Sequence, residues 1–395
     1  MITVEEAKDL VHKYSQNNTI HTVQLGDSFG CTLAKSVYAP ISLPPFAQSA
    51  MDGYAIRFED LSVGNSFTLQ GESKAGANTN ELIKAQHCVR IFTGAPTPLN
   101  ATAVVIQERA SVFGDQIQFD TTNLKEFSNI RPIGEQINAD QLALPAGTLL
   151  NAGSIGFLAS LGISEIDVYT TPRIAIIVTG DELTQAGNPL DFGKIYESNS
   201  ITLQCALQET GFNKFALEFI KDDFETTVNK IEELQNNYDY LIFTGGISVG
   251  DYDFTGKALE KLGAECFFYK VKQKPGKPLY FGKLNNTYVF GLPGNPAAAL
   301  TCYYQYVFPS LQKYMGKTKT GLHKIELPLC HDFTQKSGRA QFLKAKFNTT
   351  AVTILGSQAS SMLASFTEAN CLVYITSDNK VYKKTDLVEV HVLPS

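Results

Sequence analysis

The sequence lacks several features that would assign it to a special class of protein. Its 395 residues contain no tryptophan, an absence that excludes no class of protein. They also contain no apolar run close to the ~20 residues that a transmembrane helix needs. The stretch from Met1 to Glu6 has neither the basic nor the apolar region of a signal peptide. The seven cysteines are scattered and form no Cys-x-x-Cys pair, which indicates reduced thiols rather than disulfides or a zinc site. We therefore expect a cytoplasmic protein without a membrane partner.

Basic residues are in deficit. The chain has 33 Lys and Arg residues against 39 Asp and Glu residues, a formal net charge of −6. This balance argues against a protein dedicated to nucleic-acid binding. Hydrophobic residues make up 44% of the chain and charged residues 18%, which is normal for globular proteins with large cores. The length predicts roughly two to four domains.

The chain alternates between strand-like and helix-like segments from residue 172 to 314. The expected strands are 173–178, 215–220, 240–243, 266–271 and 287–290, and the expected helices are 198–210, 224–234, 255–262 and 297–314. Ser198 or Asn199 could cap the first of these helices. The alternation predicts a doubly wound, largely parallel sheet, whose strands end at one edge where open α/β sheets bind ligands.

Small and charged residues cluster where these expected strands end. They are Asp181, Glu182, Asp222, Gly245, Gly246, Ser248, Gly250, Asp253, Lys270, Lys274, Lys277, Pro293, Gly294 and Asn295. A glycine-rich loop can be only a tight turn, and a lysine-rich loop only a solvated surface. At the edge of a parallel sheet, glycines bring backbone N–H groups close to a ligand, and lysines beside a helix N-terminus hold an anion. Carboxylates nearby can bind Mg²⁺, so the pattern predicts a phosphate-bearing ligand bridged by this metal.

The segments on either side of the α/β region are predicted to be rich in β-structure. Residues 53–131 show short strands separated by turns, which is typical of a small all-β insertion. Residues 317–395 predict a small β-barrel or sandwich. Residues 3–14 predict an amphipathic helix, with Thr3 and Glu6 in the positions of a capping box.

Two turns near the β insertion carry polar side chains. Asp52 lies in an Asp-Gly pair just before the insertion, and Thr93 lies in a small-residue turn within it. Each turn could be purely structural, since Asp-Gly is a common turn pair. Small residues beside a lone carboxylate nevertheless suit a site that a ligand approaches closely.

Six segments together resemble the molybdopterin molybdenumtransferase family, which includes MoeA and the E domain of gephyrin. These segments are Ser49 to Ala55, Thr93 to Pro96, Thr179 to Leu183, Gly245 to Gly250, Lys274 to Pro278 and Gly291 to Pro296. The resemblance covers nearly the whole chain and implies a multidomain α/β plus β fold. The implied parts are an extended domain I (1–52 and 132–171), a β-rich domain II (53–131), a MogA-like α/β domain III (172–316) and a β-barrel domain IV (317–395).

The resemblance also implies a reaction and its partners. A homodimer would insert molybdate into adenylylated molybdopterin, hydrolysing the adenylate and releasing AMP with Mg²⁺, after a molybdopterin adenylyltransferase has supplied the substrate. The cleft would form between domain III of one subunit and domain II of the other. The implied catalytic residues are Asp52, Thr93, Glu182, Asp222 and Asp253, of which Asp222 and Asp253 would bind Mg²⁺. The implied substrate-binding residues are Gly245, Gly246, Ser248, Gly250, Lys270, Lys274, Lys277, Pro293, Gly294, Asn295, Lys344 and Ser360.

Two residues depart from the family's pattern and leave alternatives open. Gln136 stands where the family has an aspartate, and Lys344 stands where an arginine is usual. The missing carboxylate is compatible with a binding or scaffold protein that has lost the chemistry, in which Gln136→Asp would restore activity. Tungstate could replace molybdate, because the two dianions are similar in size. The adenylylating enzyme shares the α/β fold, but the additional domains argue against that activity.

Overall fold

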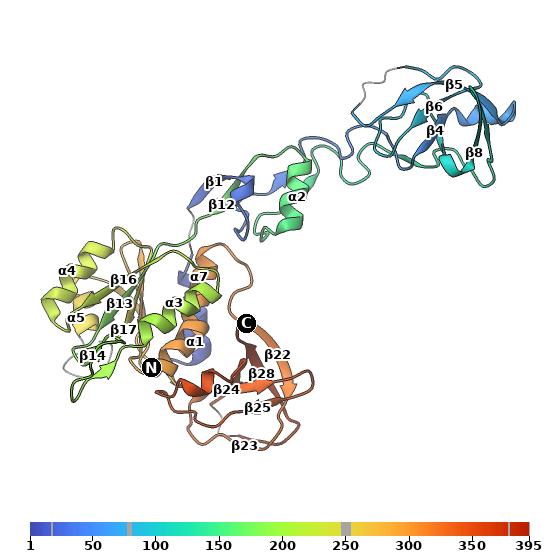
Figure 1. The fold of residues 1–395 in the computed structure, drawn as a ribbon. Coiled ribbons are helices and arrows are strands. Elements are labelled where there is room, and N and C mark those ends of the chain that lie inside the picture. The colour runs from blue at the N-terminus through green and yellow to red at the C-terminus, as the bar shows by residue number, and fades with distance from the viewer. Residues whose placement is uncertain (17–18, 77–80, 246–253, 378–379, 395) are drawn as a thin grey trace. The chain divides into compact units, whose positions relative to one another are not determined.

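The computed structural model describes residues 1–16, 19–76, 81–245, 254–377 and 380–394, in two compact units (Figure 1). The larger unit comprises Met1–His21 and Tyr169–Ser395, and the smaller comprises Thr22–Val168. The chain passes between the units within β1 (Ile20–Gln24) and β12 (Glu165–Tyr169), which pair with each other. All seven cysteines are free, and no helix of the described ranges is long and apolar enough to cross a membrane.

The larger unit is built on a six-stranded α/β sheet. In spatial order its strands are β16 (Phe215–Ile220), β13 (Ile174–Thr179), β17 (Tyr240–Thr244), β21 (Thr287–Leu292), β20 (Tyr280–Leu284) and β18 (Glu265–Phe268). The first four strands run parallel, as the alternating pattern predicts. Strand β20 is antiparallel to both of its neighbours, β21 and β18, and was not among the expected strands. The sheet is therefore mixed, with its parallel part in the centre and at the β16 edge.

Helices bury both faces of this sheet. One face packs against α1 (Val4–Tyr14), α3 (Asn199–Glu209), α6 (Pro296–Cys302) and α7 (Phe308–Tyr314), and the other against α4 (Phe224–Leu234) and α5 (Phe254–Lys261). Alternate residues of β13 point to opposite sides, so Ile176 joins the first core and Ile177 the second. Burial on both faces explains why β13, β17 and β21 read as continuous apolar runs.

One expected helix is confirmed in detail and another is interrupted. The capping box of α1 is present, because Thr3 Oγ1 accepts a hydrogen bond from the Glu6 N–H and Glu6 Oε2 accepts one from the Thr3 N–H. The segment expected as one helix over 297–314 is instead interrupted by a π-helical turn, Tyr303–Val307, between α6 and α7. Such turns are rare and concentrate at functional sites.

The C-terminal part of the larger unit is a second six-stranded sheet. Its strands are β19 (Gln273–Lys274), β24 (Ala340–Phe347), β26 (Cys371–Ile375), β28 (Leu387–Val392) and β22 (His323–Pro328), with β25 (Val352–Ile354) paired to β24. Because β19 lies in the lysine-rich segment 270–278 of the α/β region, its parallel pairing with β24 ties the two sheets of this unit together.

The smaller unit contains a third six-stranded sheet, with an extended segment beside it. In spatial order the strands are β7 (Ala103–Ile106), β4 (Gly53–Ile56), β6 (His87–Ile91), β5 (Ser66–Ser73), β9 (Gln116–Phe119) and β8 (Ala110–Phe113). The extended segment holds α2 (Ala152–Ser160) and the strand pairs β2 (Val37–Tyr38) with β11 (Leu142–Leu144), and β3 (Gln48–Ser49) with β10 (Ile130–Arg131). These elements confirm the expected multidomain α/β plus β fold.

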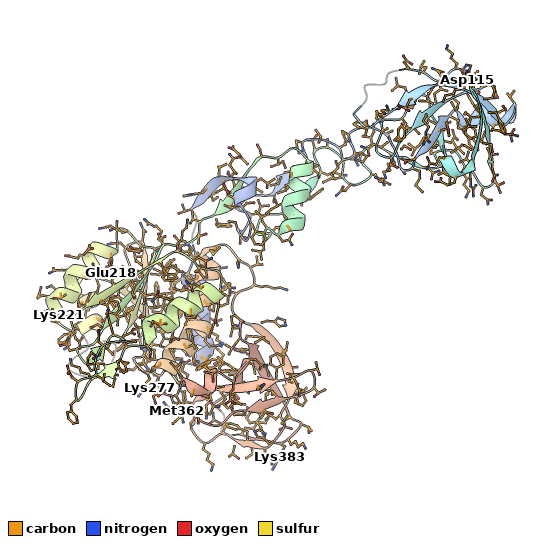
Figure 2. All side chains as sticks on the ribbon, in the orientation of Figure 1. Asp115, Glu218, Lys221, Lys277, Met362 and Lys383 are labelled. Carbon is orange, nitrogen blue, oxygen red and sulfur yellow. The ribbon has the colours of Figure 1, made fainter. Side chains whose placement is uncertain are left out.

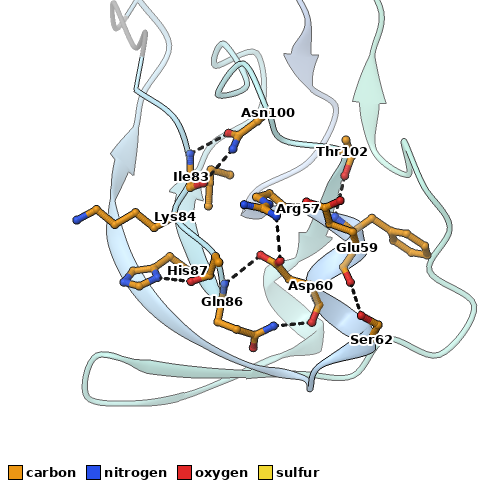
Figure 3. A network of polar contacts seen from close by, with 12 residues as sticks. Arg57, Glu59, Asp60, Ser62, Ile83, Lys84, Gln86, His87, Asn100 and Thr102 are labelled. Atoms are coloured by element: carbon orange, nitrogen blue, oxygen red, sulfur yellow. Dashed lines mark hydrogen bonds and ion pairs between the residues drawn. The ribbon is translucent and has the colours of Figure 1, made fainter.

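A buried acid, Asp60, helps to hold the loop 83–86, which leads into β6 (Figure 3). The Gln86 backbone N–H donates to Asp60 Oδ2 at 3.0 Å, and Arg57 Nη2 lies 3.4 Å from Asp60 Oδ1. The Asn100 side chain accepts from the Ile83 N–H at 2.8 Å and donates to the Ile83 carbonyl at 2.9 Å. Charge-assisted and paired contacts of this kind order a loop that has few apolar side chains to bury.

We predict that the cores of the two units can be destabilised separately. Phe290 in the larger unit and Phe67 in the smaller are both fully buried, and Phe→Ala substitutions in cores cost about 3–5 kcal/mol. Phe290→Ala should lower hydrogen-exchange protection within Met1–His21 and Tyr169–Ser395 only, and Phe67→Ala within Thr22–Val168 only. Mass spectrometry of amide exchange resolves the two regions. Loss of protection in both units from either substitution would contradict the division.

Candidate active site

A cavity of about 500 Å³ lies where β13, β17 and β21 end. Its walls include Thr179 at the end of β13, Thr244 and Gly245 at the end of β17, and the loop 293–296 that follows β21. The position agrees with the expectation that ligands bind at the carboxyl edge of the parallel strands. Of the residues proposed from the sequence, those that line the cavity are Glu182, Gly245, Pro293, Gly294 and Asn295.

Gly245 permits a close approach between two strand ends. Its φ is +86°, and a Cβ added at this position would lie 2.3 Å from the Thr179 carbonyl oxygen. A Cβ added to Gly294 would lie 4.0 Å from the Gly245 Cα, so Gly245 is also close to the loop that follows β21. Any side chain at 245 would push the Thr179 end of β13 away and change the shape of the cavity.

Asn199 connects two walls of the cavity and was missed as a site residue. Its Nδ2 donates to Thr244 Oγ1 at 2.7 Å and to the Gly294 carbonyl at 2.8 Å. Its Oδ1 is buried and has no hydrogen-bond partner among the described residues. A buried amide oxygen without a donor is unfavourable, so this atom is suited to accept a hydrogen bond from a ligand in the cavity.

The expected capping role of Ser198 or Asn199 is wrong. Ser198 occupies the N-cap of α3, but its side chain makes no capping hydrogen bond, and Asn199 bonds the cavity walls instead. The buried Glu197 replaces them, because its carboxylate accepts from the Ser200 N–H at 2.8 Å and from Ser200 Oγ at 2.6 Å. A negative charge at a helix N-terminus is favourable, which frees Asn199 for the cavity.

Three acids gather at the ends of β13 and β16. Glu182 lines the cavity, and Asp222 Oδ1 accepts from Thr179 Oγ1 at 3.1 Å. Burial raises the pKa of Asp222, although the Thr179 hydrogen bond opposes this, and the negative charges of Asp181 and Glu182 raise it further. Within the described ranges, no three His, Cys, Asp or Glu side chains are arranged to hold a metal ion. Gly246, Ser248, Gly250 and Asp253 lie outside the described residues.

The three lysines predicted to bind phosphate do not line the cavity. Lys274 and Lys277, the latter labelled in Figure 2, are exposed, and Lys270 is half-buried beside the Tyr269 ring. Pro278, which follows Lys277 directly, does line the cavity. The lysine-rich segment therefore adjoins the cavity through its last residue.

Ser360 and Lys344 belong to the C-terminal sheet and its loops. Ser360 Oγ accepts from Asn295 Nδ2 at 2.9 Å, and its carbonyl accepts from the Ala298 N–H at 3.1 Å. Lys344 is only 3% exposed, and its Nζ donates to the carbonyls of Ser357, Met362 and Ala359 at 2.8, 2.9 and 3.4 Å. An ammonium group has three N–H donors, so in this arrangement all of them hold the loop 357–362, which carries Ser360 to the cavity wall.

Asp52 and Thr93 meet in the smaller unit, although 41 residues separate them. Asp52 Oδ1 accepts from the Thr93 N–H at 2.7 Å and from Thr93 Oγ1 at 2.8 Å. These hydrogen bonds lower the pKa of the exposed Asp52 carboxyl, and the nearby Arg90 guanidinium lowers it further. Arg90, which the sequence did not single out, is fixed by the Gly53 carbonyl at 2.9 Å. Asp52 is therefore an ionised carboxylate held in place by Thr93.

Three family models match the chain in succession. The MoeA N-terminal region (domains I and II) matches residues 2–162, a probable molybdopterin binding domain matches 175–313, and the MoeA C-terminal region (domain IV) matches 326–393.

Named relatives and solved structures are similar over almost the full length. Molybdopterin molybdenumtransferase of Haemophilus influenzae is 32% identical over 386 residues, covering 96% of this chain and 95% of the relative. The Staphylococcus aureus protein of the same name is 31% identical, covering 98% and 95%. The crystal structure of a molybdopterin biosynthesis MoeA protein from Pyrococcus horikoshii superposes with a TM-score of 0.85 at 27% identity, covering 100% of both chains. This chain belongs to the MoeA family of molybdopterin molybdenumtransferases.

We predict that Lys344 acts by positioning the loop 357–362. Lys344→Met keeps the length of the side chain but leaves its acceptor carbonyls without donors, and hydrogen bonds to charged groups contribute about 1.5–3 kcal/mol. Amide exchange in the loop should accelerate, and catalytic turnover should fall more than ligand affinity. The matched control is Lys346→Met, because Lys346 is exposed on the same strand. Unchanged exchange in the loop of Lys344→Met would refute the positioning role.

Proposed function

We propose that this chain inserts molybdate into adenylylated molybdopterin, hydrolysing the adenylate and releasing AMP, in molybdenum cofactor biosynthesis. The observation that carries the proposal is the full-length similarity to proteins named molybdopterin molybdenumtransferase, at 31–32% identity. A strand-end cavity in the part that matches a probable molybdopterin binding domain supports it. An adenylyltransferase reaction must precede this step, because an adenylylated pterin is consumed. We place both reactions in the cytoplasm.

The residues of the cavity suit an anionic, ring-bearing substrate. Gly245 and Gly294 leave the backbone accessible, and Asn199 offers an unpartnered oxygen to a ring N–H or a hydroxyl. The neighbouring Lys274 and Lys277 would neutralise the phosphates and the incoming molybdate. Binding adenylylated molybdopterin and molybdate in one cavity lowers the entropic cost of bringing the two reactants together.

Oxygen ligands are available for Mg²⁺ beside this cavity. Asp222 lies close to Asp181 and Glu182, and burial, together with the negative charges of these two residues, raises its pKa. A bound cation would offset both effects by favouring the ionised carboxylate. Mg²⁺ prefers a small number of carboxylates together with phosphate oxygens and water. We propose Asp222 and Asp253 as its protein ligands. When bound, the metal would supply positive charge at the phosphates and polarise the bond to be cleaved.

The direct test supplies adenylylated molybdopterin, molybdate and Mg²⁺ and follows AMP release and formation of active cofactor. Failure to form either product would refute the proposal. The alternative, a binding or scaffold protein that lacks turnover, rests on Gln136, which is exposed and donates its N–H to the Leu43 carbonyl at 2.9 Å. Pterin binding without AMP release, and activity regained in Gln136→Asp, would favour that alternative.

We predict that the active site is shared between two subunits, with Asp52 and Thr93 of one chain acting at the cavity of the other. Asp52→Asn and Asp253→Asn should each inactivate the homodimer. Heterodimers formed by mixing the two variants contain one site with both carboxylates intact if the site is shared, and none if each chain acts alone. Recovered turnover in the mixture measures the difference, and wild-type mixed with each variant calibrates it. Absence of recovery in verified heterodimers would refute the shared site.

The raised pKa of Asp222 leads to a pH prediction. A carboxyl group must be ionised to bind Mg²⁺, so the metal affinity should fall as the pH drops through the pKa of Asp222 in the folded protein. Because that pKa is raised, the fall should begin at a higher pH than for an ordinary aspartate. Calorimetric Mg²⁺ titrations at several pH values measure this. Asp222→Asn should weaken binding and remove its pH dependence, whereas Asp223→Asn, at the exposed N-cap of α4, should leave the pH dependence in place.

A further inference from the structure

A second cavity, of about 220 Å³, lies between α1, the π-helical turn and the C-terminal sheet of the larger unit. It shares no lining residue with the strand-end cavity. Val11, Pro309 and Leu322 give it apolar walls, and Lys8 and Lys324 give it positive charge. The cavity is therefore amphipathic and separate from the proposed active site.

Gln305 lines this cavity and is incompletely hydrogen-bonded. The residue lies in the π-helical turn Tyr303–Val307 and is 3% exposed. Its Oε1 lies 2.9 Å from His391 Nδ1, whereas its buried Nε2 has no hydrogen-bond partner among the described residues. A buried amide nitrogen without an acceptor is unfavourable unless a bound molecule supplies one. Gln305 thus offers a donor to an oxygen of a ligand.

Two lysines near Gln305 can pair with an anion. Lys8 Nζ lies 5.1 Å from the centre of the Phe342 ring and 5.4 Å from that of Tyr374, so aromatic faces hold it at the cavity. Lys324 Nζ lies 3.0 Å from Glu389 Oε1, so its charge is partly compensated. The charged and titratable groups that line the cavity or contact His391 are Lys8, Asp9, His12, Tyr304, Lys324, Tyr374, Glu389 and His391 itself.

We propose that this cavity binds a small carboxylate with an apolar body, whose carboxylate accepts hydrogen bonds from Gln305 Nε2 and Lys8 Nζ. A cavity of ~150 Å³ holds benzene, so the space at this site accommodates a ring of that size with a carboxylate attached. The apolar walls disfavour a fully hydrated anion such as phosphate. The proposal is independent of the reaction at the strand ends.

Both ring nitrogens of His391 face acceptor oxygens, an arrangement that suits a protonated imidazole. Its Nε2 lies 2.6 Å from Glu389 Oε1 and its Nδ1 lies 2.9 Å from the side-chain Oε1 of Gln305. Burial, however, lowers the pKa of His391 to about 4, and burial together with Lys324 lowers that of Lys8 to about 8. A bound anion raises both values, because it favours the charged forms. Binding should therefore take up protons and become tighter as the pH falls.

Benzoate is the probe for this site, with benzyl alcohol and inorganic phosphate as comparisons. Titration of the intact protein, followed by calorimetry and by the His391 imidazole NMR signals, should show saturable benzoate binding with a Kd of roughly 1 mM. The His391 pKa should rise on saturation. Gln305→Glu, which places a like charge in the cavity, and Lys8→Met should each weaken binding by about tenfold or more.

Lys13→Met is the matched control, because Lys13 is exposed on the same helix outside the cavity and its removal should not change benzoate affinity. Thermal unfolding of each variant verifies the fold, and the Lys8 variant remains informative if Gln305→Glu fails to fold. The proposal is overturned if benzoate does not saturate at millimolar concentrations. It is also overturned if phosphate or benzyl alcohol binds equally well, or if Lys8→Met binds as the wild type does.

Discussion

The close approach of Gly245 to the Thr179 carbonyl oxygen is the contact on which the strand-end cavity depends. With no Cβ at 245, the end of β17 can lie close to the end of β13 and to the loop that follows β21. Asn199 then joins Thr244 to Gly294 across the gap. The site is therefore shaped by backbone geometry first, and polar side chains are added to a frame that is already fixed.

The C-terminal sheet completes this frame. Its buried Lys344 directs three hydrogen bonds at one loop, and that loop brings Ser360 to Asn295 at the start of α6. Keeping an ammonium group buried is costly, and burial lowers the pKa of Lys344. The cost is offset only while the loop stays in place, so the charge and the loop conformation stabilise each other.

Much of the fold was predictable because local signals and tertiary structure agree. Helix α4 and strand β16 have the bounds that apolar periodicity predicts, and the capping box of α1 is present. Strand β20 was missed because Gly282 and Lys283 interrupt its apolar pattern, and only its pairing with β21 defines it. The strand-end location of the site followed from parallel topology. The role of Asn199 did not, because its partners are 45 and 95 residues away.

The packing of α1 affects how the chain can fold while it is being synthesised. Ser15, just after α1, bonds Ser310 Oγ at 2.6 Å, and Tyr288 donates to the Tyr14 carbonyl. The partners of α1 are thus synthesised nearly 300 residues after it, and the whole of Thr22–Val168 is synthesised in between. Closing so long a loop has a high entropic cost, so the inserted unit can fold while α1 still lacks these partners and is accessible to chaperones.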